Sequence, residues 1–216
     1  MPSDKFSAVW VSHSSINDFL RCPRLYFLNN VYKNPDTGRK VSLTNPHLSL
    51  GQVVHDVLES LSELPVEKRF DIPLKVLLNV KWAKVHGKIG GFKNDIEEMQ
   101  FKDRALTMLT NVEQKPGPIL EKAIKLLLEN CQKREIKKAS YWYLDKQEFV
   151  DSELPSAEES EKRVMEVAMK IKEARATNNF ACERSGCYAC EAMEKILTGE
   201  AEFVGVGQYN KEIYRV

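Results

Sequence analysis

The 216-residue sequence has no long apolar run, almost no net charge, no internal repeat and no low-complexity tract. Without about 18 consecutive apolar residues, no segment is long enough for a membrane-spanning helix. Residues 1–6 contain no apolar stretch of the kind that a secretory signal needs. We therefore expect a cytoplasmic protein with no membrane partner. A net charge of +1 leaves nucleic acid open, because a basic groove can exist on a neutral protein.

The chain has only five cysteines, and the placement of four of them is informative. In a cytoplasmic protein, cysteines are reduced, buried or metal-bound rather than paired in disulfides. Cys187 and Cys190 form a C-x2-C pair and Cys182 lies five residues before it, so that thiolates can face one zinc ion or iron–sulfur cluster. Cys22 is the candidate fourth ligand, which would join the two ends of the chain. The alternative is three reduced loop thiols with Cys22 in the core. We expect Cys131 to be a small buried hydrophobe.

Apolar periodicity predicts a helix-rich protein with few strands. Ser15, with Asp18 three residues later, is the expected cap of the first helix. Pro23 cannot continue that helix but suits the first turn of another, so Cys22 should lie at a joint between two helices. A polar loop is expected over 33–47. Further helices are expected over 74–86, 95–111 and 119–131 and after a Ser156 cap, and strands over 8–11, 139–144, 149–150 and within 203–216.

The next helix carries the candidate catalytic metal ligand, His55. Ser49 and Gln52 make a capping box at its start. His55 lies about one turn from both Gly51 and Glu59, on the flank of the helix. A neutral imidazole held by a helix can bind a divalent metal, and glycine lets a ligand approach. The alternative is a half-exposed histidine bonded to a neighbour. We expect His55 to be partly exposed in a polar cleft. The apolar face of this helix comprises Leu50, Val53, Val54, Val57, Leu58 and Leu61.

Two further patterns are compatible with nucleic-acid binding. One is a basic cluster made of Lys133, Arg134, Lys137 and Lys138. The other is the alternation of Trp142 with Tyr141 and Tyr143 on a predicted strand. A solvated surface is the commoner role of such a charge run, and sheet core is the commoner role of alternating aromatics. Phosphate contacts and a base-stacking platform are the functional alternatives.

Two segments carry a resemblance to a known family. Ser14-Ser-Ile-Asn-Asp-Phe-Leu-Arg-Cys-Pro-Arg-Leu-Tyr26 and Gly51-Gln-Val-Val-His-Asp-Val-Leu-Glu59, with the C-terminal cysteines, resemble the PD-(D/E)XK nuclease superfamily. The resemblance covers residues 7–62 and 136–197 and points to the RecB-like branch, which includes the CRISPR adaptation nucleases and the AddB-type recombination nucleases.

This resemblance implies an α+β fold, helix-rich, with a small truncated mixed sheet of the restriction-endonuclease-like type. It implies Mg²⁺- or Mn²⁺-dependent cleavage of DNA, with His55 as a ligand of the catalytic metal. It also implies a four-cysteine 4Fe-4S cluster. The cluster ligands would be Cys22, Cys182, Cys187 and Cys190.

The sequence departs from the family in two respects. Its C-x4-C-x2-C spacing differs from that of the cluster-bearing members, so iron–sulfur, zinc and no metal all stay open. The family's Gly-x-x-Asp and Asp/Glu-x-Lys motifs are not found, and the chain passes from Lys125 into Leu126 as though core strands were missing. Neither Asp145-Lys146 nor Asp95-Ile-Glu97 fits these motifs in position or context. Because Mg²⁺ prefers several oxygen ligands, we expect no metal-dependent cleavage by this chain.

The sequence thus predicts a single domain over 1–216. Its parts are an N-terminal helical motif region (7–62), a helical insertion (63–132) and a C-terminal strand, helix and cysteine segment (133–216). The expected function is that of a catalytically incomplete DNA nuclease in repair, recombination or defence. The alternatives are a non-catalytic module that binds DNA or a helicase, and a purely structural domain stapled by cysteines. Expected partners are single-stranded DNA or duplex ends, and a helicase or another nuclease-complex subunit.

Overall fold

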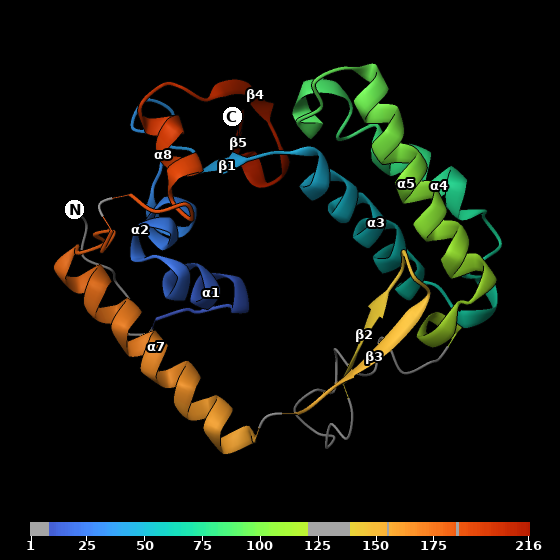
Figure 1. Ribbon diagram of the computed structural model, residues 1–216, viewed down its shortest axis with the longest axis horizontal. Coiled ribbons are helices and arrows are strands. Elements are labelled where there is room, and N and C mark those ends of the chain that lie inside the picture. Colours follow the sequence, from blue (N-terminus) through green and yellow to red (C-terminus); the bar gives the residue numbers. More distant parts are fainter. Residues whose placement is uncertain (1–8, 121–138, 155, 185) are drawn as a thin grey trace. The chain divides into compact units, whose positions relative to one another are not determined.

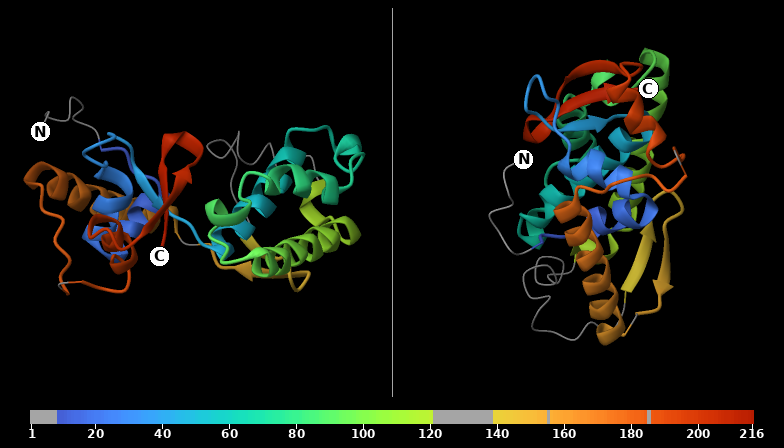
Figure 2. Two further views of the ribbon diagram at one scale, coloured as in Figure 1. Left: turned by 90° about the horizontal axis from the view of Figure 1, so that it is seen from above. Right: turned by 90° about the vertical axis from the view of Figure 1, so that its left-hand side faces the viewer.

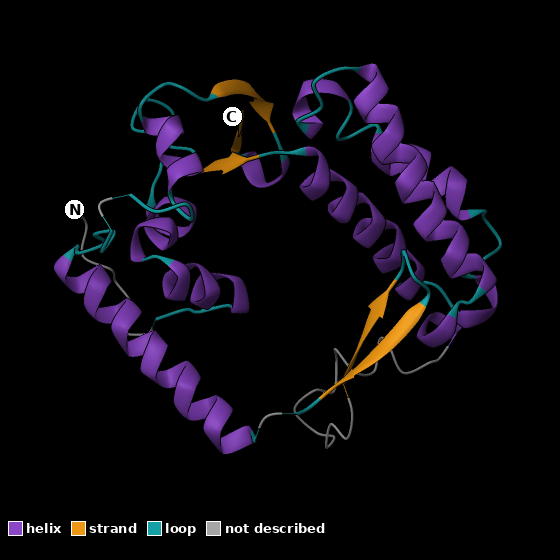
Figure 3. Ribbon diagram, in the orientation of Figure 1, coloured by secondary structure: helices purple, strands orange, loops and turns teal. Residues whose placement is uncertain are grey.

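The computed structural model describes residues 9–120, 139–154, 156–184 and 186–216, and the chain divides into two compact units. The first unit comprises 1–43 and 155–216, and the second comprises 44–154. Helices dominate the described residues, with one small mixed sheet and one hairpin (Figure 3), which confirms the helix-rich α+β class. None of the described helices has the length and apolar character that a membrane span requires. The expectation of a single domain stays a prediction.

The first unit begins with two helices that meet at Cys22, as expected. α1 (His13–Arg21) is capped by Ser12. The Ser12 hydroxyl accepts a hydrogen bond from the Ser15 amide, and the Ser15 hydroxyl accepts one from the Ser12 amide. The expected Ser15 cap is therefore wrong by one turn. The backbone becomes extended at Cys22, and Pro23 then opens α2 (Pro23–Tyr26), which continues into a π-helical turn over Phe27–Val31. Proline suits this first position because it has no amide hydrogen to leave unpaired.

The long helix α7 (Ala157–Thr177) packs against α1 in the first unit (Figures 1 and 2). It starts at the expected cap, since the Ser156 hydroxyl accepts the Glu159 amide. The spacing of Val164, Val167, Ala168 and Ile171 predicts an apolar stripe on this helix, and Val167 and Ile171 are indeed buried beside Tyr26. Val164 is 42% exposed, so the stripe is displaced toward the C-terminal end of the helix.

A small mixed sheet completes the first unit. β1 (Val41–Leu43) pairs in parallel with β5 (Glu212–Arg215), which pairs antiparallel with β4 (Glu202–Val206). A 3-10 turn over Gln208–Asn210 joins β4 to β5. α8 (Glu191–Leu197) contacts β1. The strands expected within 203–216 are confirmed. The expectation of a polar loop over 33–47 is wrong in its second half, where Val41–Leu43 form β1.

In the described part of the second unit, three helices and a hairpin pack around an apolar core. The helices are α3 (Pro46–Ser62), α4 (Leu74–Trp82) and α5 (Asp95–Gln114), and the hairpin strands are β2 (Ala139–Tyr143) and β3 (Glu148–Ser152). Short 3-10 turns lie at Val66–Lys68, Gly87–Gly90 and Gly117–Leu120. The hairpin is antiparallel as expected, with Trp142 opposite Phe149 and their rings stacked 5.2 Å apart. All members of the predicted apolar face of α3 are buried except Leu58, which is half-buried.

α3 begins one turn before the expected capping box. The Asn45 side chain accepts the Leu48 amide, and Pro46 occupies the first helical turn. Ser49 lies inside the helix, where its hydroxyl donates to the Gly90 carbonyl at 2.9 Å. Gly91 follows with φ of +81°, and a Cβ there would lie 2.6 Å from the Asn45 Cα. The chain therefore approaches the start of α3 at a position that only glycine can occupy.

A buried carboxylate joins α4 to α5. Glu98 accepts hydrogen bonds from the Trp82 indole (2.9 Å) and the Gly87 amide (2.9 Å), and its carboxylate also lies 3.0 Å from the His86 Nδ1. Burial raises the pKa of Glu98, but these bonds outweigh it and lower the pKa overall. The hydrogen bond between His86 and Glu98 also raises the pKa of His86. α4 thus ends at Trp82 rather than at residue 86, because the chain turns to bring His86 and Gly87 to Glu98.

Some expectations fail elsewhere or cannot be compared. Val9 and Val11 form no strand, and they pack instead against the cluster that contains Tyr26 and Ile171. Of the helix expected over 119–131, only Ile119 and Leu120 are described, and they belong to the 3-10 turn at Gly117–Leu120; residues 121–131 lie outside the described residues. Cys131 and the basic cluster of 133–138 also lie outside them.

Candidate functional site

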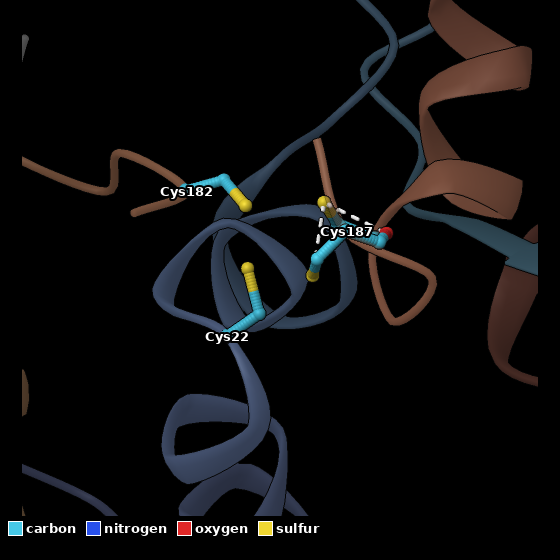
Figure 4. Close-up of side chains that lie close together, drawn as sticks. Cys22, Cys182 and Cys187 are labelled. Carbon is cyan, nitrogen blue, oxygen red and sulfur yellow. Dashed lines mark hydrogen bonds between the residues drawn. The ribbon is translucent and has the colours of Figure 1, made fainter. Parts of the chain in front are cut away.

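Four cysteines converge in the first unit (Figure 4). Cys22 comes from the joint between α1 and α2, Cys182 from the loop after α7, and Cys187 and Cys190 from the segment that leads into α8. The four sulfur atoms all lie within 4.8 Å of one another, and the sulfurs of Cys187 and Cys190 are 3.7 Å apart. The expectation that Cys22 would lie beside the C-terminal pair is confirmed.

Local structure explains why these cysteines meet. The amides of Cys190 and Glu191 both donate to the Cys187 carbonyl, which folds the C-x2-C pair into a tight turn. Arg24 of α2 binds Glu194 of α8 through two hydrogen bonds of 2.5 and 3.1 Å. This bidentate pair, like the cysteines, connects segments that are far apart in the sequence, and such pairs have a defined geometry.

The four thiols differ in acidity. Hydrogen bonds from the Arg184 and Gly186 backbone lower the pKa of Cys182 to about 6. The pKa of Cys187 is also lowered, mainly by the Cys190 backbone. Burial raises the pKa of Cys22, and it raises the pKa of Cys190 to about 12. The pKa is thus lowered at two of the thiols, Cys182 and Cys187, and raised at the other two, Cys22 and Cys190. A cation among them would favour the thiolate form of all four.

The spacing of the sulfurs can be compared with the metals that thiolates hold. Around a tetrahedral zinc ion, Zn–S bonds of about 2.3 Å place thiolates about 3.8 Å apart. The 3.7 Å separation and the 4.8 Å limit fit this arrangement. An iron–sulfur cluster needs wider spacing, because its own irons and sulfides lie between the thiolates. The donor set therefore fits one thiophilic ion such as zinc.

A second donor group lies on α3, in the second unit. Ligand atoms of His55, Asp56 and Glu59 lie within 4.8 Å of one another. The His55 Nδ1 is 3.8 Å from a Glu59 carboxylate oxygen, and the two side chains are 75% and 66% exposed. His55 is thus exposed on the flank of the helix and is not packed into its apolar face. Asp56 was missed by sequence reasoning, although its position next to His55 was a usable signal.

His55 stands at the rim of a pocket of about 420 Å³ formed wholly by the second unit. The expected polar cleft is wrong in character, because this pocket is mainly apolar. Asp145 and Lys146, which seemed out of context in the sequence, line the same pocket, since the hairpin turn packs beside α3. Asp145 is paired with Arg104 at 2.7 Å. The pocket walls are formed by Leu50, Val54, Leu58, Met108, Trp142 and Leu144.

Other groups considered in the sequence take separate positions. Asp95 and Glu97 lie in the exposed first turn of α5, where the Glu97 carboxylate accepts a hydrogen bond from the Lys93 amide. Their role is therefore to stabilise the start of the helix. Tyr141 and Tyr143 are 63% and 48% exposed, while Trp142 is half-buried against the core. One face of this strand therefore packs against the core through Trp142, and the other face exposes Tyr141 and Tyr143.

A family model described as the PD-(D/E)XK nuclease superfamily matches residues 10–129. This range includes both N-terminal segments that carried the resemblance, and it extends through α4 and α5. Neither the curated proteins nor the solved structures gave a match to the chain. The matched range contains Cys22 and His55, whereas Cys182, Cys187 and Cys190 lie beyond it.

Proposed function

Because the chain belongs to the PD-(D/E)XK nuclease superfamily, we propose that it is a DNA-binding member that does not cleave DNA by itself. Its four-cysteine group binds a structural metal ion. The partners are single-stranded DNA or duplex ends, and a helicase or another subunit of a nuclease complex would supply what this chain lacks. The free cysteines suit a reducing compartment such as the cytoplasm.

The contrast between the two donor groups carries this proposal. The cysteine group takes ligands from three separate segments and is partly buried. The His55 group takes all of its ligands from one exposed helix surface, and among the described residues no second element adds a carboxylate to it. A catalytic Mg²⁺ needs near-octahedral oxygen coordination, and it must also hold a water and a phosphate. One helix flank is a poor support for that geometry.

The cysteine group has a structural role in this proposal. Cys22 would hold the joint of α1 and α2, while Cys182, Cys187 and Cys190 would hold the loop before α8. The bound ion supplies folding free energy, because the unfolded chain has no preformed site. The sulfur spacing supports a single zinc ion over the iron–sulfur cluster that the family resemblance implies.

A second candidate function is a Mg²⁺- or Mn²⁺-dependent deoxyribonuclease. The closeness of the His55, Asp56 and Glu59 ligand atoms favours it. In that case these side chains would hold one ion, which would activate water and stabilise charge on the phosphate.

One experiment separates the two functions. The full chain is titrated with labelled single-stranded and duplex DNA, and the same mixtures are incubated with Mg²⁺ or Mn²⁺ and resolved on a gel. We expect DNA binding without any cleavage from wild type, from His55→Ala and from a control, His13→Ala, at another exposed histidine. Cleavage that His55→Ala abolishes and His13→Ala leaves intact would establish the nuclease. Absence of binding to every DNA would refute both functions.

A further inference from the structure

We propose that the apolar pocket beside His55 receives one unstacked base of single-stranded DNA. This inference rests on the proposed DNA binding and specifies its substrate class. The pocket volume of about 420 Å³ lies within the range of about 300–1,000 Å³ that is usual for ligand sites. A base in a duplex is stacked and paired, so only a single strand or an opened end can present it at low cost.

The lining suits a flat, weakly polar ring. Trp142 and Met108 offer aromatic and thioether surface, and Leu50, Val54 and Leu58 on α3 add apolar surface. Few polar atoms face the pocket, so it can contact the face of a base while the hydrogen-bonding edge stays in water and is not read. We therefore expect binding that tolerates every base, as stacking sites usually do.

The hairpin side of the pocket is held in place before any ligand binds. Trp142 stacks on Phe149 with an angle of 13° between the rings. The Asn111 amide of α5 donates to the Leu144 carbonyl at 2.9 Å, and Arg104 binds Asp145 at 2.7 Å. A wall fixed by these bonds loses little freedom on binding, which favours affinity.

The rim provides charge for the phosphate that accompanies a base. The Lys146 side chain lines the pocket and makes no ion pair within the described part of the chain. A lysine near a nucleic-acid backbone acts through its positive charge and gives salt-dependent affinity. The pocket thus pairs an apolar interior with a cation at its edge, which matches a nucleotide better than it matches an uncharged apolar ligand.

Gly51 offers a way to close the pocket without disturbing the core. It lines the pocket, lies inside α3, and has nothing within 4 Å of the position its Cβ would take. Leucine is a good helix former, so Gly51→Leu should fold and place its side chain in the pocket. Gln52→Leu is the matched control, because Gln52 is the exposed neighbour on α3 and does not line the pocket.

The test measures binding of the full chain to labelled oligothymidylate and to an abasic strand of equal length. Both strands carry the same phosphates, so their affinity ratio isolates the bases. We expect wild type to prefer oligothymidylate by about tenfold, within the range known for base stacking on aromatic side chains. Gly51→Leu should reduce this ratio to near one, and Gln52→Leu should retain it.

Two results would overturn the inference while DNA binding stands. One is an affinity ratio near one for wild type, which would mean that the pocket binds an apolar side chain of a protein partner and not a base. The other is a tenfold ratio that survives Gly51→Leu, which would place the bases elsewhere. Failure of wild type to bind either strand would refute the proposed function itself. Lys146→Gln should also weaken the salt dependence, and Lys75→Gln, on exposed α4 surface, should leave it unchanged.

Discussion

Removing the Glu98 carboxylate should destabilise the second unit by an amount that its hydrogen bonds set. Glu98→Ala leaves the buried Trp82 indole without an acceptor and deprives the Gly87 amide of its partner. Each unsatisfied buried donor costs about 1–3 kcal/mol, so we expect a loss of about 3 kcal/mol in the free energy of unfolding. Asp103→Ala, on exposed α5 surface, should change it by no more than about 0.5 kcal/mol.

The same network predicts a pH dependence. The pKa of Glu98 is lowered from its ordinary 4.5, so its stabilisation is present above that pH and is lost as pH falls through the folded-state pKa. The pKa of His86 is raised from 6.5, so its stabilisation is full below that pH and is lost as pH rises through the folded-state pKa. The network should therefore contribute most between these two ordinary values.

Urea unfolding at a series of pH values, followed by tryptophan fluorescence, measures both effects. Glu98→Gln keeps the shape of the side chain and removes its charge, so its stability should vary less with pH than that of wild type. The reasoning would be refuted if wild type and Glu98→Gln changed in parallel across the whole series. It would also be refuted if Glu98→Ala cost no more than Asp103→Ala.

Other predictions concern the cysteine group and two glycines. Cys22→Ser should lower the unfolding temperature strongly, and a metal chelator should destabilise wild type but leave this variant almost unchanged; equal chelator effects on both would contradict a metal there. Gly91→Ala should cost about 2 kcal/mol or more in urea unfolding, because its φ is positive and a Cβ would collide with Asn45. Gly51→Ala should instead stabilise the chain by up to about 1 kcal/mol, since its helical position is open; a loss at Gly51 equal to that at Gly91 would contradict this account.

Local sequence patterns predicted much of the secondary structure. The proline after Cys22 correctly predicted the joint between α1 and α2, and the spacing of apolar residues correctly predicted the buried face of α3. Helix starts were displaced where several polar residues compete for the cap. The first helix is capped by Ser12 rather than Ser15, and α3 is capped by Asn45 rather than Ser49. In both cases the side chain of the actual cap reaches a free amide of the first turn. The periodicity of a helix does not encode that choice.

The candidate site was predictable only in part. The cysteine spacing and the family resemblance together indicated which four thiols meet, and their sulfurs do lie together. The pocket beside His55 was not predictable, because the hairpin that carries Trp142 and Lys146 is about 90 residues further along the chain. Only tertiary packing brings that hairpin to α3. The Glu98 network was missed for the same reason, since no pattern marks a buried carboxylate.

Metal analysis of the full chain tests the central claim most directly. The protein is purified without oxygen and without added metal, and its zinc, iron and visible absorbance are measured beside those of Cys22→Ser. We predict one zinc per chain in wild type, none in the variant, and no visible absorbance. Several irons per chain with strong visible absorbance would contradict the single-ion site, and a metal-free wild type whose stability is indifferent to added zinc would contradict a metal site of any kind.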